Sequence, residues 1–159
     1  MRLAEEKKIV PLLASANTGA GVSLDSMNMK NYHRATIIMT NGATSGSAVL
    51  KIYSGATDAA LTSTVNFSYA YGGGAIAAAS ADYLSATTNV TAASGLTLAS
   101  GTFSSKMIVF EVDASEMDIA NGEEWLTLNI SSAGTTGITH AVAILEPRYT
   151  GNRSATCLA

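Results

Sequence analysis

The feature that most constrains the fold is a pair of apolar runs separated by an acidic bend, within residues 106–130. Apolar side chains recur at alternate positions of Lys106–Val112, and Trp125–Ile130 repeats the pattern. A period of two is typical of a β-strand that buries one face, whereas an amphipathic helix repeats about every 3.6 residues. This stretch therefore predicts two core strands joined by the bend.

Further runs of the same period predict an all-β fold. Arg34–Thr40 and Ser47–Ser54 alternate clearly, and Asn41-Gly42 between them is a turn sequence, so we expect these two strands to form a hairpin. Thr64–Tyr71 and Ile138–Leu145 are the other strong strand candidates. About eight short strands without a long helix are typical of an antiparallel β-sandwich or jelly roll.

The two ends of the chain differ from this central part. Residues 1–21 contain a charged start, a short apolar segment and a glycine-containing joint, and Pro11 argues against a central strand there. Residues 148–159 follow Pro147 as a second tail. We expect extended arms at both ends of a sandwich domain that spans residues 22–147, packed either on this domain or on a neighbouring subunit.

The composition predicts a weakly charged surface. Charged residues make up 13% of the chain, against about 25% in typical proteins. Because charge keeps soluble proteins apart, its scarcity indicates that other protein covers much of this surface. The net charge of −3 gives no electrostatic support to nucleic-acid binding. No apolar run has the length of a membrane span, and Glu5 and Glu6 disrupt a signal-peptide pattern, so we expect synthesis in the cytoplasm.

The acidic bend allows two interpretations. Its carboxylates and glycine have the chemistry of a Ca²⁺ site, although the spacing does not match an EF-hand loop. Alternatively, Ser115 with Asp118 resembles a helix cap, and Asn121-Gly122 ends a single turn before the next strand. We favour the capped turn and predict no metal or cofactor. The residues that a cation would use are Asp113, Glu116, Asp118, Asn121 and Glu124, around Gly122.

Few side chains are available for catalysis. His33 and His140 are the only histidines, and no G-x-S-x-G sequence marks a nucleophilic serine. A hydrolase would need an acid–base pair beside a nucleophile, and the two histidines give it little support. The single cysteine, Cys157, has no partner for an intrachain disulfide. We therefore do not expect an enzyme.

Two segments resemble a known family. Residues 26–40 read SMNMKNYHRATIIMT, and residues 123–151 read EEWLTLNISSAGTTGITHAVAILEPRYTG. Together they cover less than half of the chain. They resemble the capsid cement or decoration proteins of tailed bacteriophages, which are encoded among the head genes and several of which are jelly rolls or β-sandwiches. Met27–Met39 is similar to the first turn and core strand of that family. Glu123–Ile130 and Ala141–Tyr149 are similar to its last two strands and its Pro-Arg-Tyr end.

This resemblance implies a structural protein located on the virion, which binds the outer surface of a phage head and stabilises contacts between major capsid subunits. Its implied partners are the major capsid protein and further copies of itself, as dimers or trimers; we expect neither nucleic acid nor membrane as a partner. The predicted contact residues lie in the two arms: Ile9, Val10, Leu12, Leu13 and Tyr149.

A carbohydrate-binding module on a phage surface or fibre is the alternative. Tyr69, Tyr71 and Tyr83 flank Gly72–Gly74, and exposed aromatic rings there would suit a sugar. The same rings would also suit a protein interface or the core. The core is the commonest place for such residues.

Overall fold

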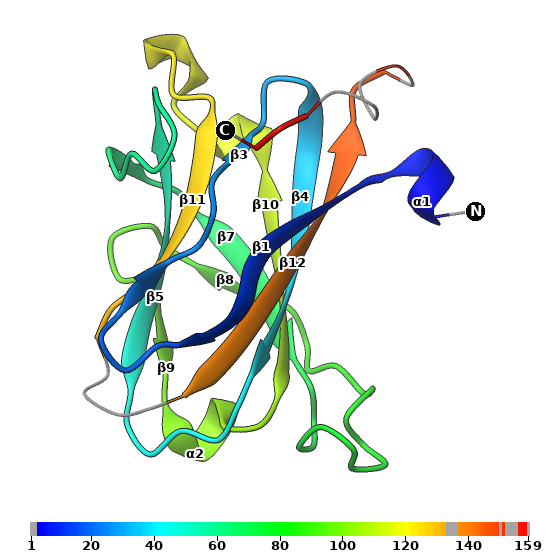
Figure 1. Ribbon diagram of the computed structural model, residues 1–159, viewed down its shortest axis with the longest axis vertical. Coiled ribbons are helices and arrows are strands. Elements are labelled where there is room, and N and C mark those ends of the chain that lie inside the picture. The colour runs from blue at the N-terminus through cyan, green and yellow to red at the C-terminus, as the bar shows by residue number, and fades with distance from the viewer. Residues whose placement is uncertain (1–2, 133–136, 150, 152–155, 159) are drawn as a thin grey trace.

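The computed structural model describes residues 3–132, 137–149, 151 and 156–158, and it consists of two packed antiparallel β-sheets (Figure 1). The predicted all-β sandwich is confirmed. Sheet A has the strand order β1-β12-β4-β10-β7-β8, and sheet B has the order β2-β11-β5-β6, with β3 beside β11 and β9 beside β5. The strands of sheet A are β1 (Lys8–Asn17), β12 (Ile138–Pro147), β4 (Tyr32–Asn41), β10 (Met107–Asp113), β7 (Phe67–Tyr71) and β8 (Thr88–Val90). Those of sheet B are β2 (Val22–Ser23), β11 (Trp125–Ile130), β5 (Ala48–Gly55), β6 (Ser63–Thr64), β3 (Met27–Asn28) and β9 (Leu96–Leu98).

Helical structure is limited to short turns. The α-helices are α1 (Leu3–Glu6) and α2 (Ser100–Phe103), and two 3₁₀ turns, η1 (Ala114–Glu116) and η2 (Ile119–Asn121), occupy the acidic bend. The core lies between the inner faces of the two sheets. Ile37, Phe110 and Leu128 are each 0% exposed there. The ring of Phe110 meets that of Phe67 edge-on, with 5.8 Å between centroids.

The predicted hairpin of residues 34–40 and 47–54 is wrong. Both strands form, but β4 pairs with β10 and β12 in sheet A, whereas β5 pairs with β11 in sheet B. Non-local contacts decide the path after β4. The Asn41 amide donates to the Phe103 carbonyl at 3.2 Å, and the Gly42 N–H donates to the Ile138 carbonyl at 2.7 Å. These contacts tie the connection to neighbouring segments, and the chain crosses to the other sheet.

The predicted N-terminal arm also needs correction. Lys8–Asn17 is strand β1, paired with β12 at the edge of sheet A. Pro11 is compatible with this position because an edge strand does not need every backbone N–H for pairing, and the register shifts just after it. Only α1 projects from the sandwich at this end (Figure 1). Part of the C-terminal tail returns to the domain, where Cys157 is 3% exposed.

Candidate functional site

The predicted contact residues fall into two groups. Val10 and Leu12 are 1% and 2% exposed within the protein's own core, so another protein cannot reach their side chains in this structure. Ile9 and Tyr149 are 44% and 75% exposed, and Leu13 is half-buried. Ile9 lies on sheet A opposite Ile144, whereas Tyr149 lies beyond the end of β12. The five residues therefore do not form one site.

The acidic bend is a pair of helical turns between β10 and β11. Gly122 ends η2 in the left-handed region, with φ 77°, as the sequence predicted. Neither turn has a side-chain cap, so the predicted cap at Ser115 and Asp118 does not form. Glu123 is 6% exposed and accepts hydrogen bonds from the hydroxyls of Ser54 and Ser63, at 2.6 and 3.1 Å. This buried carboxylate joins the bend to sheet B.

The other carboxylates of the bend point to separate partners. Asp113 pairs with Arg34, at 3.1 Å between Oδ1 and Nε. Glu116 accepts from the Asn66 amide at 2.9 Å, and Asp118 accepts from the Asn121 amide. Within the described residues, no three His, Cys, Asp or Glu side chains come together as a metal site requires. The structure does not assemble the candidate cation site.

The two histidines lie on the surface. The Nε2 atom of His140 is 2.8 Å from the hydroxyl of Ser15, which links β12 to β1. A serine beside a histidine is one part of a nucleophilic pair. Here, however, both residues are exposed to water, Ser15 on the edge strand β1 and His140 on the neighbouring strand β12.

The tyrosines do not share one platform. The rings of Tyr69 and Tyr71 stack at 6.3 Å on the inner side of β7, and the Tyr71 ring packs against Phe103 at 5.1 Å. Tyr83 is 74% exposed in the connection between β7 and β8. Tyr69 and Tyr71 therefore belong to the margin of the core, and this geometry does not favour the carbohydrate-binding alternative.

Sheet A carries an apolar outer face, which we define as the side chains of its first four strands that point away from the core. In the central row, Val142 lies opposite Ile38, and Ile38 lies opposite Val109. These side chains are half-buried, so no other part of the described chain seals them from solvent. The apolar members of the outer face are Ile9, Pro11, Ile38, Met107, Val109, Ile138, Val142 and Ile144.

Strand β12 shows how unusual this face is. Its smaller side chains, Ala141 and Ala143, point into the core at 6% and 0% exposure, whereas Val142 and Ile144 point outward. The inward side of the strand also carries Leu145, at 0% exposure. Val142 and Ile144 remain half-buried, so contact with another molecule would remove further apolar surface from water.

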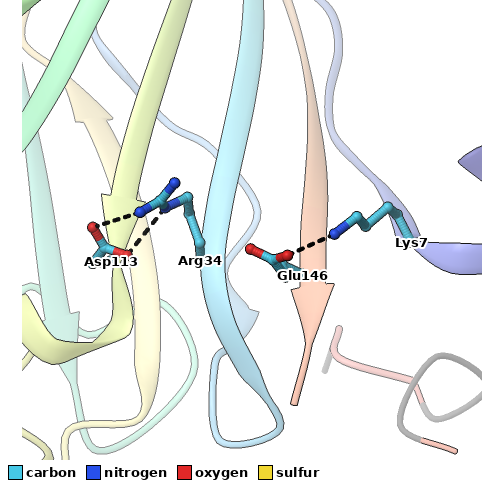
Figure 2. A network of polar contacts seen from close by, with 4 residues as sticks. All are labelled: Lys7, Arg34, Asp113 and Glu146. Atoms are coloured by element: carbon cyan, nitrogen blue, oxygen red, sulfur yellow. Dashed lines mark hydrogen bonds and ion pairs between the residues drawn. The ribbon is translucent and has the colours of Figure 1, made fainter. Parts of the chain in front are cut away.

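A row of alternating charges, here called the charge ladder, borders one end of the outer face (Figure 2). Glu146 and Asp113 lie on either side of Arg34 in the strand register, and the Lys7 ammonium donates to the Glu146 carboxylate at 2.8 Å. Across the sheet, the ladder therefore reads plus, minus, plus, minus. The hydrogen bond from Lys7, followed by its positive charge, lowers the pKa of Glu146.

Cys157 and Tyr32 form a buried pair near the C-terminal tail. Burial is the main cause that raises the pKa of each group, and a hydrogen bond between the two side chains further raises the pKa of Tyr32. The raised pKa keeps the thiol protonated and unreactive. This pair is structural, since it fastens the tail to β4.

Three strands of sheet A have a sequence pattern that could have indicated the apolar outer face, although alternation alone does not reveal it. Ile37-Ile38-Met39, Met107–Phe110 and Ala141–Leu145 are continuous apolar runs rather than strict alternations. Continuous runs are typical of strands with apolar contacts on both faces.

Comparisons with known proteins add little to this description. No protein family model and no curated protein matches the sequence. The crystal structure of the SPBc2 prophage-derived protein YomS is similar over 87% of this chain and 91% of that chain, with 11% identity and a TM-score of 0.44. These values do not establish a family. No helix among the described residues has the length and hydropathy to cross a membrane.

Proposed function

We propose that the protein is a structural component of a tailed-phage head, which binds the outer surface of the capsid and stabilises contacts between major capsid subunits. The observation that carries the proposal is the apolar outer face of sheet A, which the described chain leaves partly exposed and which a protein that assembles in many copies on a head would cover with further protein. A regular β-face with large aliphatic side chains turned away from the core suits contact with other protein. The segments that resemble capsid decoration proteins, residues 26–40 and 123–151, include β4, β11 and β12, and β4 and β12 build half of this face.

The capsid contact is assigned to the end of the molecule where α1 projects. Leu3 and Tyr149 are 38% and 75% exposed there. An open groove between α1 and the end of β12 is lined by Glu5, Glu6, Lys7, Glu146, Pro147, Arg148 and Tyr149. An exposed aromatic side chain beside a polar groove is a common anchor in protein interfaces.

The first test asks whether the protein is on the particle. Virions of the phage or prophage that encodes the chain are purified, and the protein is sought by mass spectrometry and by immunogold labelling. We expect many copies per particle, located on the head. Absence of the protein from purified particles, or its location on the tail alone, would contradict the proposal.

A second test locates the contact. Deletion of residues 1–16 is unsuitable, because it would remove Val10 and Leu12 from the core. Deletion of residues 2–6 removes α1 and keeps Lys7 and β1. We expect this variant, and Tyr149→Ala, to bind heads that lack the protein at least about tenfold more weakly. Ile119→Ser is the matched control, since Ile119 is 41% exposed on η2 and should not affect binding.

A further inference from the structure

We infer that the outer face of sheet A is a homodimer interface, in which two copies pack face to face around a twofold axis that runs along the strands between β12 and β4. The inference concerns this chain in solution and does not depend on the proposed function. It specifies the partner, the surface and the symmetry of the contact.

The charge ladder identifies the partner as a second copy. A twofold axis along the strands reverses the order of the strands in the facing sheet, so plus, minus, plus, minus meets minus, plus, minus, plus. Lys7 then faces Asp113 of the second copy, and Glu146 faces Arg34 of the second copy. Every charge in the row meets an opposite charge. The pattern is complementary to itself, whereas an unrelated partner would need a matching row of its own.

The ladder has free surface for this contact. The side chains of Glu146 and Asp113 remain 48% and 51% exposed in their intramolecular pairs, and that of Arg34 remains 45% exposed. Carboxylates accept several hydrogen bonds, and a guanidinium donates several. The second copy can therefore extend each pair into a network without breaking it.

The central apolar row matches under the same axis. In the central row, Val142 faces Ile38 of the second copy, and Val109 faces Pro11, by the register that joins these four residues across the sheet. Glu111 is the one acidic residue among the apolar rows. Its row also contains Ile9, Ile144 and Thr36, so Glu111 faces Ile9 of the second copy, one row away from Lys7 of that copy.

The charges also favour a twofold axis along the strands over one that runs across them. A twofold axis that runs across the strands within the ladder places each charge over its own kind. The same axis through the central row moves the ladder over the opposite end of the face, where the charges lose water without gaining partners. Both arrangements are unfavourable, since an unpaired charge is costly to bury.

The size of the face predicts a weak dimer. Four strands about 4.8 Å apart, each contributing about 20 Å of length, give a footprint of roughly 400 Å² per copy. A standard stable interface buries about 800 Å² per partner. We therefore expect a dissociation constant on the order of 10 to 100 μM. A head surface that holds many copies close together would favour the dimer further.

The decisive experiment exchanges charges within the intramolecular pairs. The first variant, Lys7→Glu with Glu146→Lys, reads minus, plus, plus, minus. The second, Arg34→Asp with Asp113→Arg, reads plus, minus, minus, plus. Each keeps opposite charges within its pairs, so the monomer should still fold. In a homodimer of either variant, every charge would face its own kind, but the two variants are complementary to each other.

Analytical ultracentrifugation from about 1 to 200 μM is the measurement, with circular dichroism to confirm folding. We expect the wild type to dimerise over this range, each variant alone to remain monomeric, and the equimolar mixture to form heterodimers. A monomeric wild type, variants that dimerise as the wild type does, or a mixture that stays monomeric would each overturn the inference.

Ile38→Arg provides a second route to the same result, because it places a charge in the central row without touching the ladder. We expect it to abolish dimers at about 200 μM. Ile119→Arg is the matched control on an exposed isoleucine outside sheet A, and it should leave dimerisation unchanged. Equal effects of the two substitutions would contradict an interface on this face.

Discussion

The outer faces of the two sheets differ in how far the protein itself buries their side chains. On sheet B, the outward Thr127 is 0% exposed, and its hydroxyl lies 2.6 Å from that of Ser26, which also accepts from the Ala59 N–H at 2.9 Å. Lys51 on the same sheet donates to the Ala93 carbonyl. On sheet A, the central row is aliphatic and partly exposed, and the charge ladder lies at one end (Figure 2). Polar side chains also lie on this face: Thr36, Thr40, Glu111 and His140.

The difference shows which outer face the chain buries with its own segments. The middle of sheet B, around Thr127, is covered by the protein's own connections and hydrogen-bonded to them, although Val49, Tyr53 and Trp125 on the same side remain half-buried. The side chains on the outer face of sheet A gain their full burial only from another molecule. A protein with a sandwich core needs one apolar face per sheet, so the second apolar face of sheet A is surplus to folding.

The largest effect on stability is expected from a substitution on the inward side of β4, compared with the same substitution on its outward side. Ile37 and Ile38 are neighbours on β4, and they point into the core and onto the outer face, respectively. Ile37→Ala should destabilise the fold by about 2–5 kcal/mol, because it leaves a cavity in the core. Ile38→Ala should cost the monomer less than about 1 kcal/mol, yet it should weaken the dimer about tenfold or more, since the contact occurs twice.

Urea unfolding at low protein concentration measures the first quantity, and ultracentrifugation measures the second. Equal losses of monomer stability from the two substitutions would show that the outer face is part of the folding core. No change in dimerisation with Ile38→Ala would remove Ile38 from the interface.

A smaller effect on stability is expected when a threonine on each sheet is replaced by valine. Thr127→Val keeps the shape of the side chain but removes the hydroxyl that pairs with Ser26 under the cover of sheet B. We expect a loss of about 1–2 kcal/mol. Thr36→Val on the outer face of sheet A should change monomer stability by less than about 0.5 kcal/mol. It should also tighten the dimer, because it adds a methyl group to the apolar rows. Thermal unfolding and ultracentrifugation of both variants provide the comparison, and a larger stability loss at Thr36 would reverse it.

Local patterns in the sequence predicted the strands well, because alternation is a property of neighbouring residues. The boundaries of β4, β5, β10, β11 and β12 lie close to the expected ones. Pairing was not predictable in the same way. Strand β1 pairs with β12, more than a hundred residues later, and nothing near Asn41-Gly42 indicates that β5 belongs to the other sheet.

The candidate site was only partly predictable, because alternation shows which residues share a face and not which face is buried. Ile9 was predicted to contact another protein, and its side chain is 44% exposed, so that role stays a prediction. Val10 and Leu12 were assigned with it, since Pro11 argued against a strand, but an edge strand accepts proline and turns both side chains inward. The charge ladder required the register of four segments, which no local pattern provides.

The smallest expected effect lies at the charged end of the outer face. Lys7, first through its hydrogen bond and then through its charge, lowers the pKa of Glu146 below its usual 4.5, and Arg34 and His33 add smaller contributions in the same direction. A carboxyl group with a lowered pKa in the folded state stabilises that state above about pH 4.5, and this contribution is lost as the pH falls through the folded-state value. The side chain is 48% exposed, so solvent screens the interaction strongly.

We therefore expect Glu146→Gln to change monomer stability by at most about 0.5 kcal/mol at pH 7. The substitution should weaken the dimer more strongly, because it also removes the ion pair between Glu146 and Arg34 of the second copy. The dimer of the wild type should weaken as the pH falls below about 4.5, and Glu146→Gln should show a smaller change over the same interval. Ultracentrifugation at pH 3.5 and 7 measures both, with carboxyl NMR titration to follow Glu146 itself. If the dimers of the variant and of the wild type weaken equally on acidification, Glu146 does not contribute to the contact. The apolar rows alone would then distinguish sheet A from sheet B.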